Sequence, residues 1–99
     1  MRLGVDRNAI RTLCERHGVT ELSLFGSVLR DDFGPDSDVD VLIEYAPMVR
    51  ASLLDFAALQ RELAETIGRR VDLVTKRALK PYLREQILAG REVIYHGQG

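Results

Sequence analysis

The chain has 99 residues, of which 45% are hydrophobic and 29% are charged, and its formal net charge is −1. This length is sufficient for one modest core, and the composition is that of a folded globular protein rather than a disordered one. The near-zero charge argues against binding driven by bulk charge, so we expect no direct nucleic-acid partner. The lone Cys14 excludes an internal disulfide and fits a reducing compartment. No apolar run approaches the roughly 18 residues of a membrane span and no signal peptide is visible, so we expect one cytoplasmic domain over residues 1–99 without a membrane partner.

The first helix is expected between Asp6, a good N-cap, and Gly18, a good terminator. Ile10, Leu13, Cys14 and His17 recur on one face of that helix. Cysteine and histidine are also zinc ligands, but two ligands without a second pair make a poor zinc site. Packing of Cys14 in the core is therefore favoured.

The rest of the chain alternates between strand and helix patterns. The Ser52-x-x-Asp55 sequence resembles a capping box, and Gly68 is a good stop signal for the helix that it begins. The elements expected after the first helix are a strand over 20–25, a Gly-Ser turn with one or two helical turns over 27–32, a strand over 39–44, a helix over 52–68, a strand over 70–75, a helix over 81–90 and a strand over 92–95.

Two aspartates at the start of the strand 39–44 are the first candidates for chemistry. Asp38 and Asp40 are two residues apart, so in a strand they point to the same face, opposite to Val39 and Val41. Neighbouring carboxylates repel each other unless a cation lies between them. Mg²⁺ prefers such oxygen ligands in combination with substrate phosphates. The pattern therefore predicts a site for a pair of Mg²⁺ ions.

The Gly26-Ser27 turn is the second candidate. Gly26 has no Cβ, which permits a close approach of a phosphate, and Ser27 offers a hydroxyl and an N–H group. Each candidate also has a plainer interpretation. Gly26-Ser27 could be a strand-to-helix turn with a Ser N-cap, and the aspartates could belong to a solvated Asp-rich loop. A calcium loop is a further alternative for the aspartates, although the later glycine and the terminal glutamate of an EF-hand are missing. The joint spacing, rather than any single piece, favours the metal site.

Gly26-Ser27, ten intervening residues and Asp38-x-Asp40 together resemble the signature of the DNA polymerase β-like nucleotidyltransferase superfamily. The Gly-Ser-x-x-Arg sequence from Gly26 to Arg30, on so short a chain, is similar to its minimal nucleotidyltransferases (MNT). These commonly occur as the antitoxins of HEPN–MNT toxin–antitoxin pairs. The resemblance implies an α/β, two-layer minimal nucleotidyltransferase fold, with helices packed on a small mixed β-sheet.

The same resemblance implies roles for individual residues. A third carboxylate is expected on a later strand, and Asp72, opposite in face to Val71 and Leu73, fits it; a solvated residue of an edge strand is the plain alternative. By resemblance, the catalytic and metal-binding residues are Asp38, Asp40 and Asp72, with two Mg²⁺ ions. The residues that would bind the triphosphate of ATP are Gly26, Ser27 and Arg30, with a bracing role at the acidic loop slightly favoured for Arg30.

The implied function is Mg²⁺-dependent transfer of AMP from ATP to a tyrosine hydroxyl of a cognate HEPN ribonuclease toxin, which would neutralise the toxin. The alternative is a non-catalytic antitoxin that neutralises its partner by complex formation alone. A transferase for a small molecule is less favoured, because such enzymes generally carry a further domain for the acceptor.

A basic run between Arg69 and Arg84 also needs an interpretation. It could receive the triphosphate tail, an acidic partner or RNA, but a solvated face is favoured for most of its members. They are Arg69, Arg70, Lys76, Arg77, Lys80 and Arg84.

Overall fold

The computed structural model describes residues 5–29, 34 and 36–97. In chain order, the elements are α1 (Arg7–His17), β1 (Val19–Phe25), the 3₁₀ helix η1 (Gly26–Leu29), β2 (Val39–Tyr45), α2 (Leu53–Ile67), β3 (Val71–Thr75), the 3₁₀ helix η2 (Lys76–Ala78), α3 (Pro81–Gly90) and β4 (Glu92–His96). The order expected from the sequence is confirmed, with ends that agree to within one residue except at η1. Of the helical turns expected over 27–32, residues 30–32 lie outside the described part, and η2 was not predicted.

The caps that the sequence predicts bound the first two helices. Asp6 accepts hydrogen bonds from the backbone N–H groups of Asn8 at 3.0 Å and Ala9 at 3.2 Å. Ser52 and Asp55 form a reciprocal capping box at the start of α2. Each helix then ends at a left-handed glycine, Gly18 or Gly68, as expected from the absence of a Cβ in these residues.

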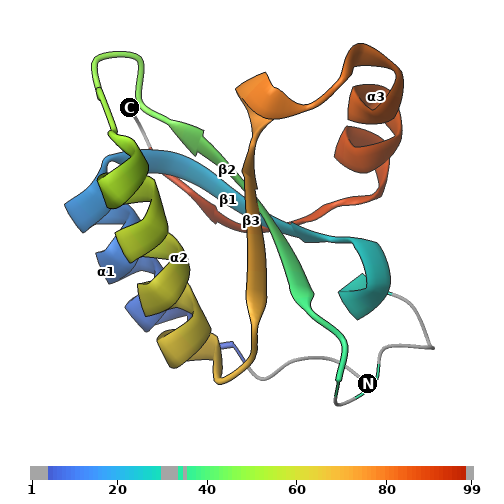
Figure 1. Cartoon of the computed structure of the whole chain (residues 1–99), viewed down its shortest axis with the longest axis horizontal. Helices are drawn as coiled ribbons and strands as arrows, with labels where there is room; N and C mark the ends of the chain where they lie inside the picture. The colour runs from blue at the N-terminus through green and yellow to red at the C-terminus, as the bar shows by residue number, and fades with distance from the viewer. Residues whose placement is uncertain (1–4, 30–33, 35, 98–99) are drawn as a thin grey trace.

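The four strands form one mixed sheet in the order β3-β2-β1-β4. β1 pairs antiparallel with β2 and with β4, whereas β2 pairs parallel with β3. The parallel pair needs a crossover, and α2 supplies it. Helices α1 and α2 lie side by side against the sheet, and α3 lies apart from them on the other side (Figure 1).

The core lies between the sheet and the pair of helices α1 and α2. Its buried side chains come from both helices and from alternate positions of β1, β2 and β3. Helix α3 has no buried residue. The fold is therefore two-layered on one face of the sheet, and the opposite face is only partly covered. None of the helices in the described part of the chain combines the length and the apolar character needed to cross a membrane.

Cys14 is fully buried in this core, as the helical pattern predicts, and not at a metal site. Its neighbour on the same helical face, His17, instead lies 3.4 Å from a carboxylate oxygen of Glu62 on α2. Burial raises the pKa of the Cys14 thiol to about 12, with a smaller contribution from Glu15.

Two leucines of α2 give a matched test of the core. We expect Leu59→Ala to lower the free energy of unfolding by about 2–5 kcal/mol, because Leu59 is fully buried and its removal leaves a cavity. Leu54→Ala on the same helix should change it by less than about 0.5 kcal/mol, because Leu54 is 83% exposed. Urea unfolding followed by circular dichroism measures both, and equal losses would contradict the assigned core.

Cys14 gives a test that depends on pH. The folded chain holds the thiol proton more tightly than the unfolded chain, whose pKa is near 9.0, so this contribution to stability is complete below pH 9 and falls as the pH rises toward 12. We expect the thiol to react with a disulfide reagent at pH 8 only after unfolding. Cys14→Val should lose less stability between pH 9 and pH 11 than the wild type, and an equal loss in both would disprove the assignment.

Candidate active site

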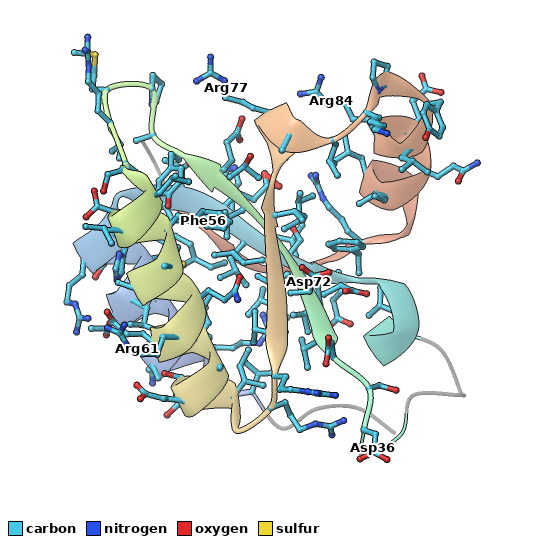
Figure 2. The ribbon with its side chains drawn as sticks, viewed as in Figure 1. Asp36, Phe56, Arg61, Asp72, Arg77 and Arg84 are labelled. Carbon is cyan, nitrogen blue, oxygen red and sulfur yellow. The ribbon has the colours of Figure 1, made fainter. Side chains whose placement is uncertain are left out.

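The parallel pairing of β2 with β3 places two of the predicted acids next to each other. Asp40 and Asp72 are register partners in the two strands. Because Val39 and Val71, which directly precede these aspartates, are buried in the core, both aspartates belong to the opposite face of the sheet. Figure 2 shows Asp72 on the side of β3 away from α2, from which Phe56 points toward the sheet. Asp72 is exposed and Asp40 is half-buried.

Gly26 lies against Asp40. The residue before it, Phe25, is the register partner of Asp40 across β1 and β2. Gly26 has a φ of +76°, and a Cβ at this position would overlap the Oδ2 atom of Asp40. The backbone conformation therefore favours glycine here, and any larger residue would displace the carboxylate of Asp40. The glycine turn and the acidic strand, fourteen positions apart in the sequence, form one site.

A pocket of about 490 Å³ opens beside this contact. It is lined from three directions: by the end of β1 with η1, by β2, and by α3. The lining residues are Phe25, Gly26 and Leu29, then Asp40, then Gln86, Ile87 and Gly90. A backbone turn, a carboxylate and a helix thus surround a space in which a phosphorylated ligand and a cation can meet.

Asp38 lies just before β2 and forms an ion pair with a cation that lies just before β3. The Oδ1 atom of Asp38 is 3.0 Å from the Nε atom of Arg70, and both side chains are at least half exposed. Arg70 also donates to the backbone carbonyl of Asp36 at 3.0 Å. Arg69 donates to the carbonyls of Gly34 and Ser37. The two arginines therefore brace the acidic loop, a role that the sequence favoured for Arg30.

The three acids do not form a ready cluster. Across residues 5–29, 34 and 36–97, no three Asp, Glu, His or Cys side chains lie close enough together to hold a metal ion. Asp40 and Asp72 still fit Mg²⁺, which binds through one or two carboxylates together with substrate phosphates. The carboxylate of Asp38 would have to exchange Arg70 for the ion.

Two predicted phosphate contacts are only partly described. Ser27 lies in η1, directly after Gly26, so its backbone is part of the turn beside the pocket. Arg30 lies outside the described residues. The roles of both stay predictions.

The solvated face expected for most of the basic run 69–84 is found for four of its six members. Arg69 is half-buried, and Lys76 is largely buried and paired with carboxylates. The exposed members of the run are Arg70, Arg77, Lys80 and Arg84. Two of these, Arg77 of η2 and Arg84 of α3, lie at the outer edge of the molecule (Figure 2).

Two features of this face were not found from the sequence. Helix α3 forms a wall of the pocket, although it is more than forty residues away from Asp40 in the chain. Glu21 is buried on β1 in contact with Lys76 and Arg91. Strand alternation gives no signal for either, because it places Glu21 simply on the face opposite to Leu22.

Comparisons with known proteins agree with this geometry. The family model described as a nucleotidyltransferase domain matches residues 6–94. Protein adenylyltransferase MntA of Thermococcus cleftensis is 42% identical over 85 residues, which cover 86% of this chain and 82% of that protein. A solved structure of a candidate minimal nucleotidyltransferase, also 42% identical, superposes with a TM-score of 0.73 over 86% of this chain and 85% of that chain.

A more distant structure shares the fold. It is a complex of tri-AMPylated Shewanella oneidensis HEPN toxin with MNT antitoxin, similar at 21% identity and a TM-score of 0.66 over 93% of this chain and 70% of that chain. The predicted two-layer fold with a mixed sheet is thus confirmed. On the match over residues 6–94 and the identity to MntA, the chain belongs to the nucleotidyltransferase domain family and is a minimal nucleotidyltransferase.

Proposed function

We propose that this protein is a Mg²⁺-dependent adenylyltransferase antitoxin, which transfers AMP from ATP to a tyrosine hydroxyl of a HEPN-domain ribonuclease toxin. The observation that carries the proposal is the register pairing of Asp40 with Asp72 beside the Gly26 turn and its pocket. The activity named for the Thermococcus relative and the AMPylated toxin in the Shewanella complex support the choice of donor and acceptor.

The reaction is an in-line displacement at the α-phosphorus of ATP. The tyrosine oxygen forms a bond to this phosphorus, the bond to the bridging oxygen of pyrophosphate breaks, and pyrophosphate leaves with the electron pair. Mg²⁺ held by Asp38, Asp40 and Asp72 would stabilise the negative charge that develops on the attacking and leaving oxygens. Two such ions are proposed.

Individual residues of the protein then have separate roles in the reaction. Gly26 lets the triphosphate approach the backbone, and the N–H groups of the turn at Ser27 donate to the β- or γ-phosphate. Arg30 contacts the triphosphate or braces the loop together with Arg69 and Arg70. Asp72, exposed on the outer strand β3, accepts the proton of the attacking hydroxyl.

One observation favours the alternative of neutralisation by binding alone. The three acids are not gathered into a metal-binding group within the described part of the chain, and Asp38 is paired with Arg70. An antitoxin that acts by binding would need none of the three carboxylates. The two functions are therefore separated by removing the acids and measuring transfer and neutralisation together.

The decisive assay incubates the protein with labelled ATP, Mg²⁺ and a HEPN-domain toxin. We expect label on a toxin tyrosine, loss of label when EDTA removes the metal, and transfer reduced at least about a hundredfold by the double variant Asp38→Asn/Asp40→Asn. Asp36→Asn is the matched control, because it removes a nearby exposed carboxylate but leaves the backbone carbonyl that accepts from Arg70.

Two outcomes would count against catalysis as the function. Wild-type protein that transfers no label would contradict the proposed activity. Full neutralisation in cells by the Asp38→Asn/Asp40→Asn variant, with no transfer, would instead establish the binding function.

Gly26 offers a second test with a built-in control. Gly26→Ala and Gly68→Ala both force alanine into a positive φ, which costs about 1 kcal/mol in either position. Only at Gly26 does the new Cβ overlap Asp40, whereas nothing lies within 4 Å at Gly68. We expect Gly26→Ala to lower transfer at least about tenfold by displacing Asp40, and Gly68→Ala to leave the rate per folded molecule unchanged.

Denaturant unfolding and label transfer on the same preparations separate the two effects. If both variants kept full transfer activity, Gly26 would be needed for the fold of the turn and not for the site.

A further inference from the structure

Helix α3 forms a wall of the pocket but packs weakly on the rest of the protein. Gln86, Ile87 and Gly90 of this helix line the pocket. None of its residues is buried, and its N-cap residue, Lys80, makes no side-chain capping bond. A helix of this length is marginal unless tertiary contacts hold it. Its apolar residues Ile87 and Leu88 are only half-buried, so further contacts are needed to keep α3 in place.

The segment that carries α3 is attached to the sheet at both of its ends through one carboxylate. Lys76, which begins η2, places its Nζ atom 3.2 Å from Oε2 of Glu21. Arg91, which directly follows α3, places its Nη2 atom 3.0 Å from the same oxygen. We call these three residues the Glu21 cluster. It brings together two residues that are fifteen positions apart and lie on either side of the helix.

Because these ion pairs are largely buried, the loss of one partner is costly. The side chains of Glu21, Lys76 and Arg91 are 9%, 16% and 20% exposed, so each charge is largely removed from water. A charge in such a position needs a partner, and loss of that partner leaves an uncompensated charge. Without Glu21, two cations would face each other at the ends of the α3 segment.

The cluster lies on the face of the sheet that carries the pocket. Glu21 and Phe25 are four residues apart on β1, so their side chains point to the same face, and Phe25 lines the pocket. A change at Glu21 can therefore reach the pocket through α3 without any contact between Glu21 and a ligand.

We propose that Glu21 is a positioning residue: by pairing with Lys76 and Arg91, it holds α3 against η1 and β2 and so sets the width of the pocket. Its role in nucleotide binding rests on the proposed function, whereas its role in holding α3 does not. Glu44 provides the matched control, because it pairs with Lys76 at 3.4 Å from a half-exposed position on β2.

Hydrogen exchange of the α3 amides tests the proposal directly. We expect Glu21→Gln to speed exchange at residues 84–90 by about tenfold or more, with exchange in α1 and α2 unchanged, because the loss is local. Glu44→Gln should change it less than about twofold, as expected for a half-exposed ion pair. In the transfer assay, Glu21→Gln should raise the apparent KM for ATP several-fold more than it lowers kcat.

Two variants that each remove the cation at one end of the α3 segment keep the proposal testable if Glu21→Gln fails to fold. Lys76→Met should loosen mainly the start of α3, and Arg91→Met mainly its last turn. Unchanged exchange in α3 for Glu21→Gln, or for both single-end variants, would overturn the proposal, as would equal effects of Glu21→Gln and Glu44→Gln. If α3 loosens as expected but no variant or wild type transfers label, the proposed function fails and the role of Glu21 stands.

Discussion

The parallel pairing of β2 with β3 is the constraint on which the site depends. It sets Asp40 opposite Asp72, where two like charges on paired strands disfavour the sheet by roughly 0.2–1 kcal/mol. On the other face, the same pairing buries Val39 and Val41 against α1 and α2, and each buried side chain contributes about 1.5–3 kcal/mol. Burial exceeds repulsion, so the sheet holds together two carboxylates that would move apart in a flexible loop.

The loop that leads into β2 is held by hydrogen bonds to the residues just before β3. The N–H of Val39 donates to the carbonyl of Arg70 at 2.8 Å, and Arg69 and Arg70 donate to carbonyls of the loop before β2. The Arg70–Asp38 pair is exposed, and exposed pairs contribute at most about 1 kcal/mol. A divalent ion with a triphosphate is a much stronger partner for a carboxylate, so the exchange that the proposed metal binding would require of Asp38 is a small one.

Much of the fold could be predicted because local signals agree with the tertiary structure. Asp6, Ser52, Gly18 and Gly68 act at the helix ends where they were expected, and alternation assigned Asp40 and Asp72 to the face away from the core. Contacts between distant segments could not be predicted in this way. Periodicity does not reveal that α3 returns to Gly26, that Glu21 is buried between two cations, or that the carboxylate of Asp38 is directed to Arg70.

The two faces of the sheet are covered in different ways, and the chemistry of the site gives a reason. A face that carries Asp40 and Asp72 cannot be sealed by an apolar helix alone, because burial of a carboxylate costs several kcal/mol unless it is paired. Helix α3 therefore covers this face without a buried residue of its own. Charged residues at the ends of its segment can hold it there while its middle stays open to a ligand. Ionic attachment at Glu21 and an accessible pocket beside Gly26 are thus two consequences of keeping acids on one face of a small sheet.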